Sequence, residues 1–453
     1  MLEKLFKLKE HDTNVKREIM AGLTTFLTMA YILAVNPNIL AASGMNPNAI
    51  FMATAIASAI ATFIMAFLAN YPIGLSAGLG LNAYFAYTVC LGELANEPDP
   101  WRIALTAVFV EGIIFILLSF FKFREQIINS IPQNLKFGIS AGIGLFIAFI
   151  GMQNARIIVA NDATVVGLGS FTDLDMVLAL VGLVIIAALV HYNIKGGVLI
   201  GIIVTWVIGM ILQAAGIYVP AEGTSLFPSF AGGYDFGAIS QTAFKLNFSW
   251  AASHIIQFLA ITFSFLYVDL FDTVGTVVGV ADKANLLDKD GNLPRVGQVF
   301  LADAVGTTAG ALLGTSTITS FVESSAGVAA GGRTGLTALT TGVMFLVSIV
   351  LSPIFLAIPS FATAPALIYV GMLMLMSITK VKFDGDIADS VGAYLAVVMM
   401  PLAYSIATGI MFAVIAWVVL KVVSKKAKDV SPVMWIVFVL FVLRIAALVA
   451  NFQ

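Results

Sequence analysis

The chain reads Tyr267-Val268-Asp269-Leu270-Phe271-Asp272 inside one membrane-length apolar segment and Ser320-Phe321-Val322-Glu323-Ser324-Ser325 inside another. A carboxylate near the centre of a bilayer costs roughly 2.5–3.5 kcal/mol on insertion scales, so such residues usually face the interior of a helix bundle or a wet cavity. Three acids within about fifty residues of so apolar a chain therefore predict a site for a polar solute or a proton.

The composition places most of the chain in a lipid bilayer. Of its 453 residues, 60% are hydrophobic and only 11% are charged, and the mean hydropathy is +1.00. Apolar runs of about twenty residues recur from end to end, which predicts an all-α polytopic membrane protein; a transmembrane β-barrel would instead show alternating segments of about ten residues. The net charge of −2 gives no sign of a nucleic-acid partner, and the lone Cys90 excludes a cysteine-built metal site.

Fourteen apolar segments are candidates for membrane spans. Some are too short to cross as full helices at about 1.5 Å per residue. A further apolar segment at about 432–450, which contains Arg444, is either an interfacial helix or a fifteenth span. The fourteen candidates are 19–40, 49–69, 75–90, 103–121, 135–153, 175–192, 196–216, 255–280, 297–313, 317–331, 334–358, 363–378, 391–405 and 408–423.

The basic residues predict an orientation. If the N-terminus is cytoplasmic, nineteen of the 23 lysines and arginines fall in cytoplasmic segments, and only Arg102, Arg156 and Lys245 fall outside, with Arg444 unassigned. This distribution follows the positive-inside rule. The polar first 17 residues show no signal-peptide pattern. We therefore expect a multi-pass protein of the cell (inner or plasma) membrane with a cytoplasmic N-terminus.

The two halves of the chain resemble each other. Thr25-Phe26 in the first span matches Thr262-Phe263 in the eighth, and Gly74-Leu75-Ser76 in the third matches Gly314-Thr315-Ser316 in the tenth, in the same order. Because seven spans are an odd number, the two halves must be inverted in the membrane, which is typical of transporters with a site near the midplane. The third and tenth spans are short and rich in glycine and serine, so we expect each to be a broken helix that lines a cavity.

Four polar residues are the main candidates for the site. Asp269 and Asp272 are three residues apart and lie on one face of the eighth helix. Glu323 is expected in the first turn of the tenth half-helix, and Asn82 in the comparable place of the third span. Carboxylates and an amide can together read a planar heterocycle rich in N–H groups, and Phe321 offers a stacking face. The structural alternatives are an interhelical hydrogen bond for either aspartate and a helix cap for Glu323 or Asn82.

Four segments resemble the AzgA-like purine permeases of the nucleobase–cation symporter-2 (nucleobase/ascorbate transporter) superfamily. The resemblance covers essentially the whole chain and departs from the family pattern at none of Asn82, Asp269, Asp272 and Glu323. The segments are Ala21-Gly22-Leu23-Thr24-Thr25-Phe26-Leu27-Thr28-Met29-Ala30-Tyr31, Gly80-Leu81-Asn82-Ala83-Tyr84-Phe85-Ala86, Asp269-Leu270-Phe271-Asp272-Thr273-Val274-Gly275-Thr276 and Glu323-Ser324-Ser325-Ala326-Gly327-Val328-Ala329-Ala330-Gly331-Gly332-Arg333-Thr334-Gly335.

The resemblance implies an organisation into core and gate domains built as a 7+7 inverted repeat. It implies alternating access between these domains, and related carriers suggest a homodimer through the gate domain. The implied division is a cytoplasmic N-terminus (1–18), core segments 1–4 (19–121), gate segments 5–7 (135–216), an extracytoplasmic loop (217–254), core segments 8–11 (255–358), gate segments 12–14 (363–423) and a C-terminal segment (424–453), interfacial or an extra span.

The resemblance also implies uptake of a purine nucleobase coupled to protons. The expected substrate-binding residues are Asn82, Asp269, Asp272, Glu323, Phe321 and Ser324. The proton-coupling candidates are Glu323, Asp272 and Asp269, and the sequence leaves their order open. An ionised Glu323 favours guanine or hypoxanthine, whose N1–H it would accept; adenine is the alternative, because its N1 is an acceptor and would need a protonated carboxyl.

Three other functions fit the sequence less well than purine transport does. A uracil or xanthine carrier of the superfamily is the nearest, and the Glu-Ser-Ser-Ala-Gly form at 323–327 disfavours it. An anion transporter of the same architecture would need a cationic or dipolar centre, whereas this centre is acidic. A membrane enzyme would need a nucleophile–base pair or metal ligands, and the central spans that carry the acids, 255–280 and 317–331, contain no histidine or cysteine to supply them. We therefore expect no enzyme activity, no metal and no cofactor beyond the coupling proton.

Overall fold

The computed structural model describes residues 2–120, 131–220, 224–230, 235–283 and 293–451. Within helices, a few residues are described by their backbone alone. Phe271 and Asp272 are two of these, so the side chain of the predicted site residue Asp272 lies outside the described part of the structure.

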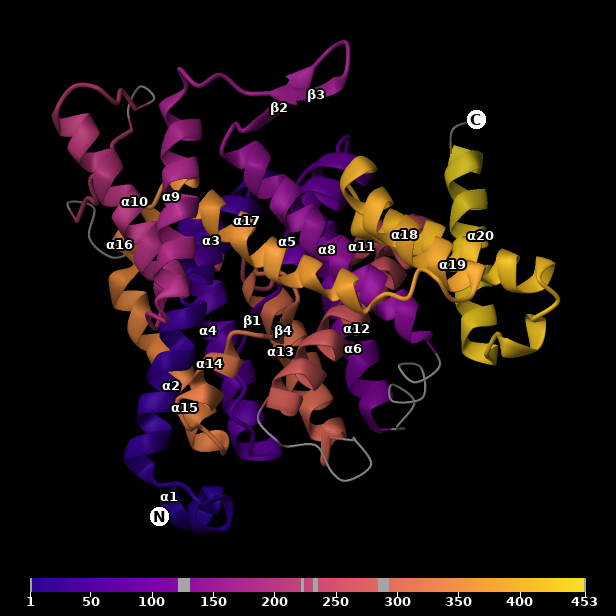
Figure 1. Cartoon of the computed structure of the whole chain (residues 1–453), viewed down its shortest axis with the longest axis horizontal. Helices are drawn as coiled ribbons and strands as arrows, with labels where there is room; N and C mark the ends of the chain where they lie inside the picture. Colours follow the sequence, from indigo (N-terminus) through magenta and orange to yellow (C-terminus); the bar gives the residue numbers. More distant parts are fainter. Residues whose placement is uncertain (1, 121–130, 221–223, 231–234, 284–292, 452–453) are drawn as a thin grey trace.

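The described chain is mostly helical, as the composition predicts (Figure 1). Two sets of helices pack mainly among themselves. The first helix group contains α2 (Val15–Met29), α3 (Ile32–Leu40), α4 (Pro47–Ile64), α5 (Leu79–Ala83), α6 (Pro100–Phe120), α12 (Ile255–Lys283), α13 (Val296–Leu313), α14 (Ser324–Ala329), α15 (Gly335–Ser348) and α16 (Ser352–Leu356). The second helix group contains α8 (Gln133–Asn154), α9 (Leu174–His191), α10 (Gly197–Ala214), α17 (Ser360–Leu375), α18 (Ile387–Leu402) and α19 (Ile406–Val423).

Shorter elements continue or connect these helices. Two are π-helices, η3 (Met65–Ala69) and η4 (Tyr84–Glu93). A hairpin of β2 (Ile158–Asn161) and β3 (Val165–Leu168) follows α8. The remaining elements are α1 (Leu2–Phe6), α11 (Phe248–Ser253), α20 (Pro432–Asn451), β1 (Leu75–Ala77), β4 (Ile318–Ser320), η1 (Leu8–His11), η2 (Ala41–Ser43), η5 (Ala238–Gln241), η6 (Ile349–Leu351), η7 (Met376–Lys380) and η8 (Ala427–Asp429).

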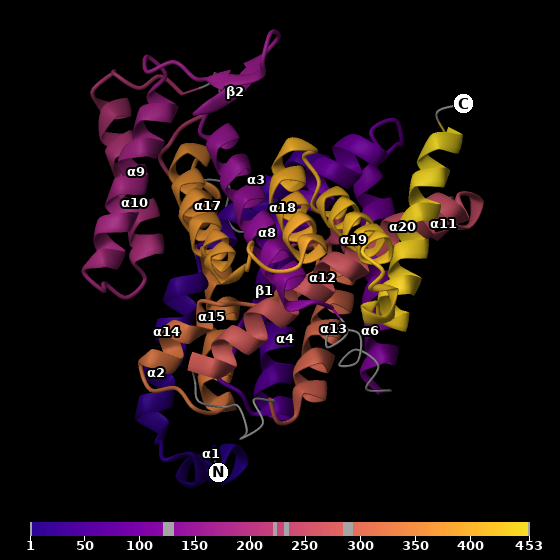
Figure 2. The ribbon, with the colours of Figure 1, turned by 45° about the vertical axis from the view of Figure 1, so that its right-hand side comes forward.

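Figures 1 and 2 show the same arrangement from two directions. The helices α9 and α10 stand at one edge of the molecule and α20 at the opposite edge, while β1 lies near the centre. The N-terminus and the β2–β3 hairpin lie at opposite ends. Ten helices in the described residues are long and apolar enough to cross a membrane, and shorter apolar helices accompany them. The prediction of an all-α polytopic membrane protein is confirmed.

The third and tenth predicted spans are broken, as their glycines and serines indicate. Each begins as a short strand and continues as a helix: β1 leads into α5 and η4, and β4 leads into α14. The two strands pair antiparallel in the register Leu75↔Ser320, Ser76↔Thr319 and Ala77↔Ile318. This pairing joins the two halves of the chain at the centre of the fold and satisfies backbone groups that lipid could not.

Two threonines satisfy the outer edges of this two-stranded sheet. Thr62 of α4 accepts a hydrogen bond from the Leu75 N–H (3.0 Å) and donates one to the Leu75 carbonyl (3.2 Å). Thr307 of α13 does the same for Ile318, at 3.3 and 3.1 Å. A hydroxyl that both donates and accepts replaces the missing neighbouring strand on each side. The same device in both halves is the local signature of the inverted repeat.

The contacts of Thr62 and Thr307 correct the alignment of the two halves that the sequence predicts. The sequence comparison aligns Leu75 with Thr315, whereas the threonine contacts make Leu75 equivalent to Ile318, three residues further along. The match rested on residue identity, but the equivalence is set by backbone pairing, which tolerates different side chains. The order of the repeat is unaffected.

The apolar segment near the C-terminus forms the single helix α20, which packs against α19 and α12. The Phe441 ring lies edge-on to the rings of Phe263 (5.4 Å) and Tyr267 (5.3 Å) of α12. Arg444, the cation that the sequence left unassigned, is buried and donates to Glu93 Oε1 at 2.7 Å. An opposite charge is what a buried guanidinium in an apolar helix requires.

A buried carboxylate on α2 caps the N-terminus of α15. Glu18 accepts hydrogen bonds from the main-chain N–H groups of Arg333, Thr334 and Thr337 and from the hydroxyls of the two threonines, at 2.6 to 3.2 Å. Glu18 is fully buried. The unpaired N–H groups at a helix start favour an anion. This contact therefore ties α2 to the turn that links α14 and α15.

We predict that Glu18→Ala destabilises the protein strongly. The change leaves the N–H groups and hydroxyls around the cap without their acceptor in a buried place, and we expect a loss of about 3 kcal/mol or more. Thermal unfolding of the detergent-purified protein would measure it. Glu10→Ala is the control, because Glu10 pairs with Lys7 at the exposed surface, where such pairs contribute about 0–1 kcal/mol. Equal melting temperatures for the two variants would contradict the prediction.

Candidate functional site

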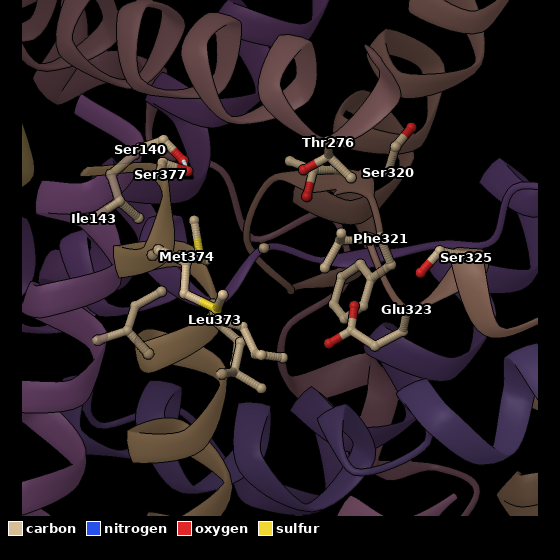
Figure 3. A pocket seen from close by; sticks show the side chains of 18 of the residues that line it. Ser140, Ile143, Thr276, Ser320, Phe321, Glu323, Ser325, Leu373, Met374 and Ser377 are labelled. Atoms are coloured by element: carbon tan, nitrogen blue, oxygen red, sulfur yellow. Dashed lines mark hydrogen bonds between the residues drawn. The ribbon is translucent and has the colours of Figure 1, made fainter. Parts of the chain in front are cut away.

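A cavity of about 500 Å³ lies between the two helix groups. This volume is within the range of small-ligand sites, roughly 300–1,000 Å³. Figure 3 shows two walls: one carries Thr276, Ser320, Phe321, Glu323 and Ser325, from α12 and the β4–α14 segment, and the other carries Ser140, Ile143, Leu373, Met374 and Ser377, from α8, α17 and η7. The broken helices therefore open directly onto the cavity.

Glu323 is the acid that lines this cavity. It immediately precedes α14, and Tyr31 Oη donates a hydrogen bond to Glu323 Oε1 at 2.6 Å. The Thr28 hydroxyl lies 3.4 Å from the Glu323 carbonyl oxygen. One carboxylate oxygen is thus held by a phenol, and a carboxylate oxygen keeps further lone pairs for other donors. The arrangement presents an oriented acceptor to the cavity.

Tyr31 is a site residue that the sequence analysis missed. It stands at the break between α2 and α3 and is fully buried. Because a buried phenol usually finds a hydrogen-bond partner, a tyrosine inside an apolar first span was a signal for a polar neighbour. That neighbour is 292 positions away in the sequence, so the first span alone could not identify it.

Phe321 and Ser324 have different surroundings. Phe321 lines the cavity beside Glu323 (Figure 3), and its N–H donates to the Gly74 carbonyl at 3.0 Å. Ser324 is buried, and its hydroxyl accepts from the Gly74 N–H at 3.0 Å. Ser324 is not among the described residues that line the cavity. Its hydrogen bond instead fixes the start of α14 to the segment before β1.

Asn82 is buried in α5 and also stands outside the cavity lining. Neither its side-chain nitrogen nor its oxygen has a hydrogen-bond partner among the residues that the structure describes. A buried amide without partners costs on the order of 1–3 kcal/mol. The position is therefore one where a ligand group, a water molecule or a side chain outside the described part would be stabilising.

Asp269 belongs to a buried network behind the cavity wall. The Thr273 hydroxyl contacts Asp269 Oδ1 at 3.2 Å and also contacts Asp303 Oδ2. Ser320 donates from its hydroxyl to Asp303 Oδ1 at 3.3 Å. Asp269, Thr273 and Asp303 are fully buried, whereas Ser320 lines the cavity. A chain of polar groups therefore leads from the cavity into the packed interior.

Asp303 is a second residue whose place the sequence did not predict. It lies on α13, four residues before Thr307, and contacts β4 through Ser320. The corresponding residue in the first half is Ser58, four residues before Thr62, and its hydroxyl lies 2.7 Å from that of Ser76. At this repeated position, the first half of the chain therefore has a serine, Ser58, and the second half has a carboxylate, Asp303. An aspartate in the middle of an apolar span was the available signal.

A third buried acid supports the strand pair. Thr317, just before β4, donates to Glu111 Oε2 of α6 at 3.3 Å, and its carbonyl accepts from the Gly78 N–H at 3.0 Å. Glu111 is fully buried. It thus contacts the chain where the two broken segments meet, away from the cavity lining.

Comparison with known proteins identifies the class of the chain. A family model described as "Permease family" matches residues 16–412. A putative permease of Methanocaldococcus jannaschii is 45% identical, over 98% of both chains. An adenine permease of Escherichia coli is 40% identical, over 100% of this chain and 97% of its own. A guanine/hypoxanthine permease of Bacillus subtilis is 42% identical, over 97% of this chain and 99% of its own.

Solved structures share the fold at low sequence identity. The transmembrane domain of a cyanobacterial bicarbonate transporter, BicA, gives a TM-score of 0.67 at 15% identity, covering 88% of this chain and 97% of that one. The anion transporter SLC26A9 of mouse gives a TM-score of 0.62 at 14% identity, covering 90% of this chain and 68% of that one. These neighbours are transporters, and the shared fold confirms the predicted transporter architecture.

We predict that Gly327→Ala destabilises the packing of α14, the helix that follows Glu323, against α2. A Cβ at Gly327 of α14 would fall on Thr25 Oγ1 and close to the Ala21 carbonyl of α2, so the two helices must separate. Overpacking of this kind costs about 1–3 kcal/mol. Gly297→Ala is the matched control, because a Cβ there meets no atom within 4 Å. Melting temperatures of the purified variants would test this, and an unchanged value for Gly327→Ala would refute it.

Proposed function

The chain belongs to the permease family of nucleobase transporters, and from this premise we propose that it imports purine nucleobases by proton symport, with guanine or hypoxanthine preferred. Its relatives are permeases and its fold is that of transporters, so it is a membrane transport protein and not an enzyme. The observation that carries the proposal is Glu323, an acceptor oriented by Tyr31 in the wall of a cavity of about 500 Å³, which is large enough for a purine.

The chemistry of the cavity wall supports a flat base with N–H groups. Glu323 supplies an anionic acceptor, and Phe321 supplies an aromatic face beside it. Charge-assisted hydrogen bonds to a carboxylate are about twice as strong as neutral ones. A cationic group is what an anion transporter would need beside Glu323. Among the described lining residues the one lysine, Lys380, is on the other wall, where its Nζ lies 5.7 Å from the centre of the Phe137 ring. The proposal therefore favours a nucleobase over an inorganic anion.

The preference for a 6-oxopurine rests on the Tyr31 hydrogen bond. Because Tyr31 donates to Glu323, the carboxylate is suited to be the ionised acceptor for the N1–H of guanine or hypoxanthine. Adenine is the second candidate and would need a protonated Glu323. Sequence identity does not separate the two, because an adenine permease and a guanine/hypoxanthine permease are 40% and 42% identical to this chain.

The Asp269–Thr273–Asp303 network supports a role in proton coupling. The Thr273 hydroxyl has one proton and contacts two carboxylates. One proton serves two acceptors poorly, so the arrangement suits a state in which one carboxyl is protonated and donates to the threonine oxygen. Two neighbouring carboxylates in a buried place favour holding one proton between them, because two adjacent negative charges repel each other. We propose that this pair takes up the coupled proton and communicates with the cavity through Ser320.

The proposed transport motion is a movement of one helix group relative to the other. In our proposal the first helix group is the core domain and the second is the gate domain. The core domain moves relative to the gate domain with the base bound to it. The position of the cavity between the groups supports this division. Inward movement of one proton would contribute roughly 2.3 kcal/mol per 100 mV of membrane potential. A cytoplasmic N-terminus and a homodimer through the gate remain predictions.

We predict protonophore-sensitive uptake of radiolabelled hypoxanthine in cells that lack their own purine carriers. Excess unlabelled guanine should block it and uracil should not. Glu323→Gln should reduce uptake at least about 100-fold, because a neutral amide loses the anionic acceptor. Glu10→Gln, at an exposed position, is the matched control. Blockade by adenine alone would move the substrate to adenine, blockade by uracil would favour the uracil/xanthine alternative, and full uptake by Glu323→Gln would mean that Glu323 is not the binding acid.

We predict that Asp303→Asn uncouples transport from the proton gradient. The amide cannot carry the shared proton, so accumulation against a gradient should be lost and its pH dependence flattened. Exchange of labelled for unlabelled base across equilibrated vesicles needs no net proton movement and should persist. Asp162→Asn, in the exposed hairpin turn, is the control. Normal accumulation with an unchanged pH profile in Asp303→Asn would rule out this role.

A further inference from the structure

We infer that Ser140 and Ser377 form a gate-side contact that reads the imidazole edge of the bound base. The inference rests on the proposed function and adds specificity-determining residues on the wall opposite Glu323. Figure 3 shows the two serines together across the cavity from Glu323 and Phe321. Their hydroxyl oxygens are 3.2 Å apart, and both residues line the cavity.

A glycine crossing places the two serines side by side. Helices α8 and α17 meet at Gly144 and Gly371, where a Cβ on either residue would fall on the carbonyl oxygen of the other. Only hydrogen fits such an approach. Ser140 lies one turn before Gly144 on the same face of α8, and Ser377 follows α17 in η7. The position of the hydroxyl pair is therefore set by backbone contact rather than by flexible side chains.

These hydroxyls are not engaged in the usual way for a membrane helix. Several other helical hydroxyls in this protein donate to the carbonyl four residues earlier, as Thr205 does to Gly201 (2.7 Å) and Ser264 to Ala260 (2.8 Å). In the described part of the chain, the hydrogen bond of Ser140 and of Ser377 is the one between them. One O–H and several lone pairs of the pair therefore remain for a ligand.

The wall around the pair is apolar. Ile143, Leu373 and Met374 flank the two serines in the cavity (Figure 3). Thr379 and Lys380 are the other polar residues of this wall among the described lining residues, and both are exposed. A small number of placed polar groups on an apolar wall is how ligand sites fix orientation.

The chemistry of the pair matches one edge of a purine. The imidazole edge presents one N–H donor and one bare nitrogen acceptor, and the hydroxyl pair offers one donor and free lone pairs. Glu323 on the opposite wall suits the pyrimidine edge. A base held by both walls would form hydrogen bonds at both its pyrimidine and its imidazole edge. The serines would therefore favour bases with an N7 acceptor, whether the base is a 6-oxopurine or adenine.

The experiment compares each base with its 7-deaza analogue, which replaces the N7 acceptor by C–H. Inhibition of labelled hypoxanthine or adenine uptake, whichever the wild type transports, would be measured for Ser140→Ala, Ser377→Ala and the double variant. Ser119→Ala is the control, because its hydroxyl donates to the Phe115 carbonyl within α6. We expect about tenfold weaker binding of the 7-deaza analogue by wild type.

The double variant should bind the parent base about tenfold more weakly than wild type does. It should bind the 7-deaza analogue as tightly as wild type does. Ligand binding and melting temperature of the detergent-purified variants would show that a change is not a failure to fold. Equal weakening of both ligands, or of neither, would overturn the inference and leave the pair as an interhelical clasp. Absence of purine uptake by the wild type would overturn the proposed function and this inference together.

Discussion

The fold depends on one constraint: inside a bilayer, each backbone N–H and carbonyl must find its partner within the protein. The chain meets this constraint at two places where it is not helical. Strands β1 and β4 pair with each other, and Thr62 and Thr307 close their outer edges. Because the two strands and the two threonines supply hydrogen-bond partners for the strand backbone, the chain can be extended at the centre of the fold. Helix α14 can then begin there, directly after Glu323.

The scaffold is symmetric but its chemistry is not. At equivalent places beside the sheet, Ser58 contacts Ser76 in one half, and Asp303 accepts from Ser320 in the other. The carboxylate at the second position links the sheet to α12 through Thr273. A duplicated frame therefore holds the backbone in both halves, while the acids beside the cavity come from the second half. The opposite wall of the cavity, held by the Gly144–Gly371 crossing, is largely apolar.

Some parts of the site could be predicted from the sequence and others could not. Glu323 and Phe321 were identified because an acid and an aromatic ring inside a Gly/Ser-rich span have few structural explanations. Tyr31, Asp303 and Ser140 were not, because each matters through a partner on another segment. Tyr31 and Glu323 are 292 positions apart. A hydrogen bond between such distant residues leaves no local pattern, and a serine in an apolar helix is usually bonded to its own backbone.

The sequence by itself determined that this is a multi-span transporter with an inverted repeat and two broken helices, because apolar runs, glycine placement and intramembrane acids reflect local requirements of chain in lipid. Only the tertiary structure decided the strand register, the partner of Glu323, the linking of Asp269 to Asp303 through Thr273, and the pairing of Ser140 with Ser377. These depend on which helices cross and at which residues. That choice is made by packing between distant segments, which no single stretch of the chain encodes.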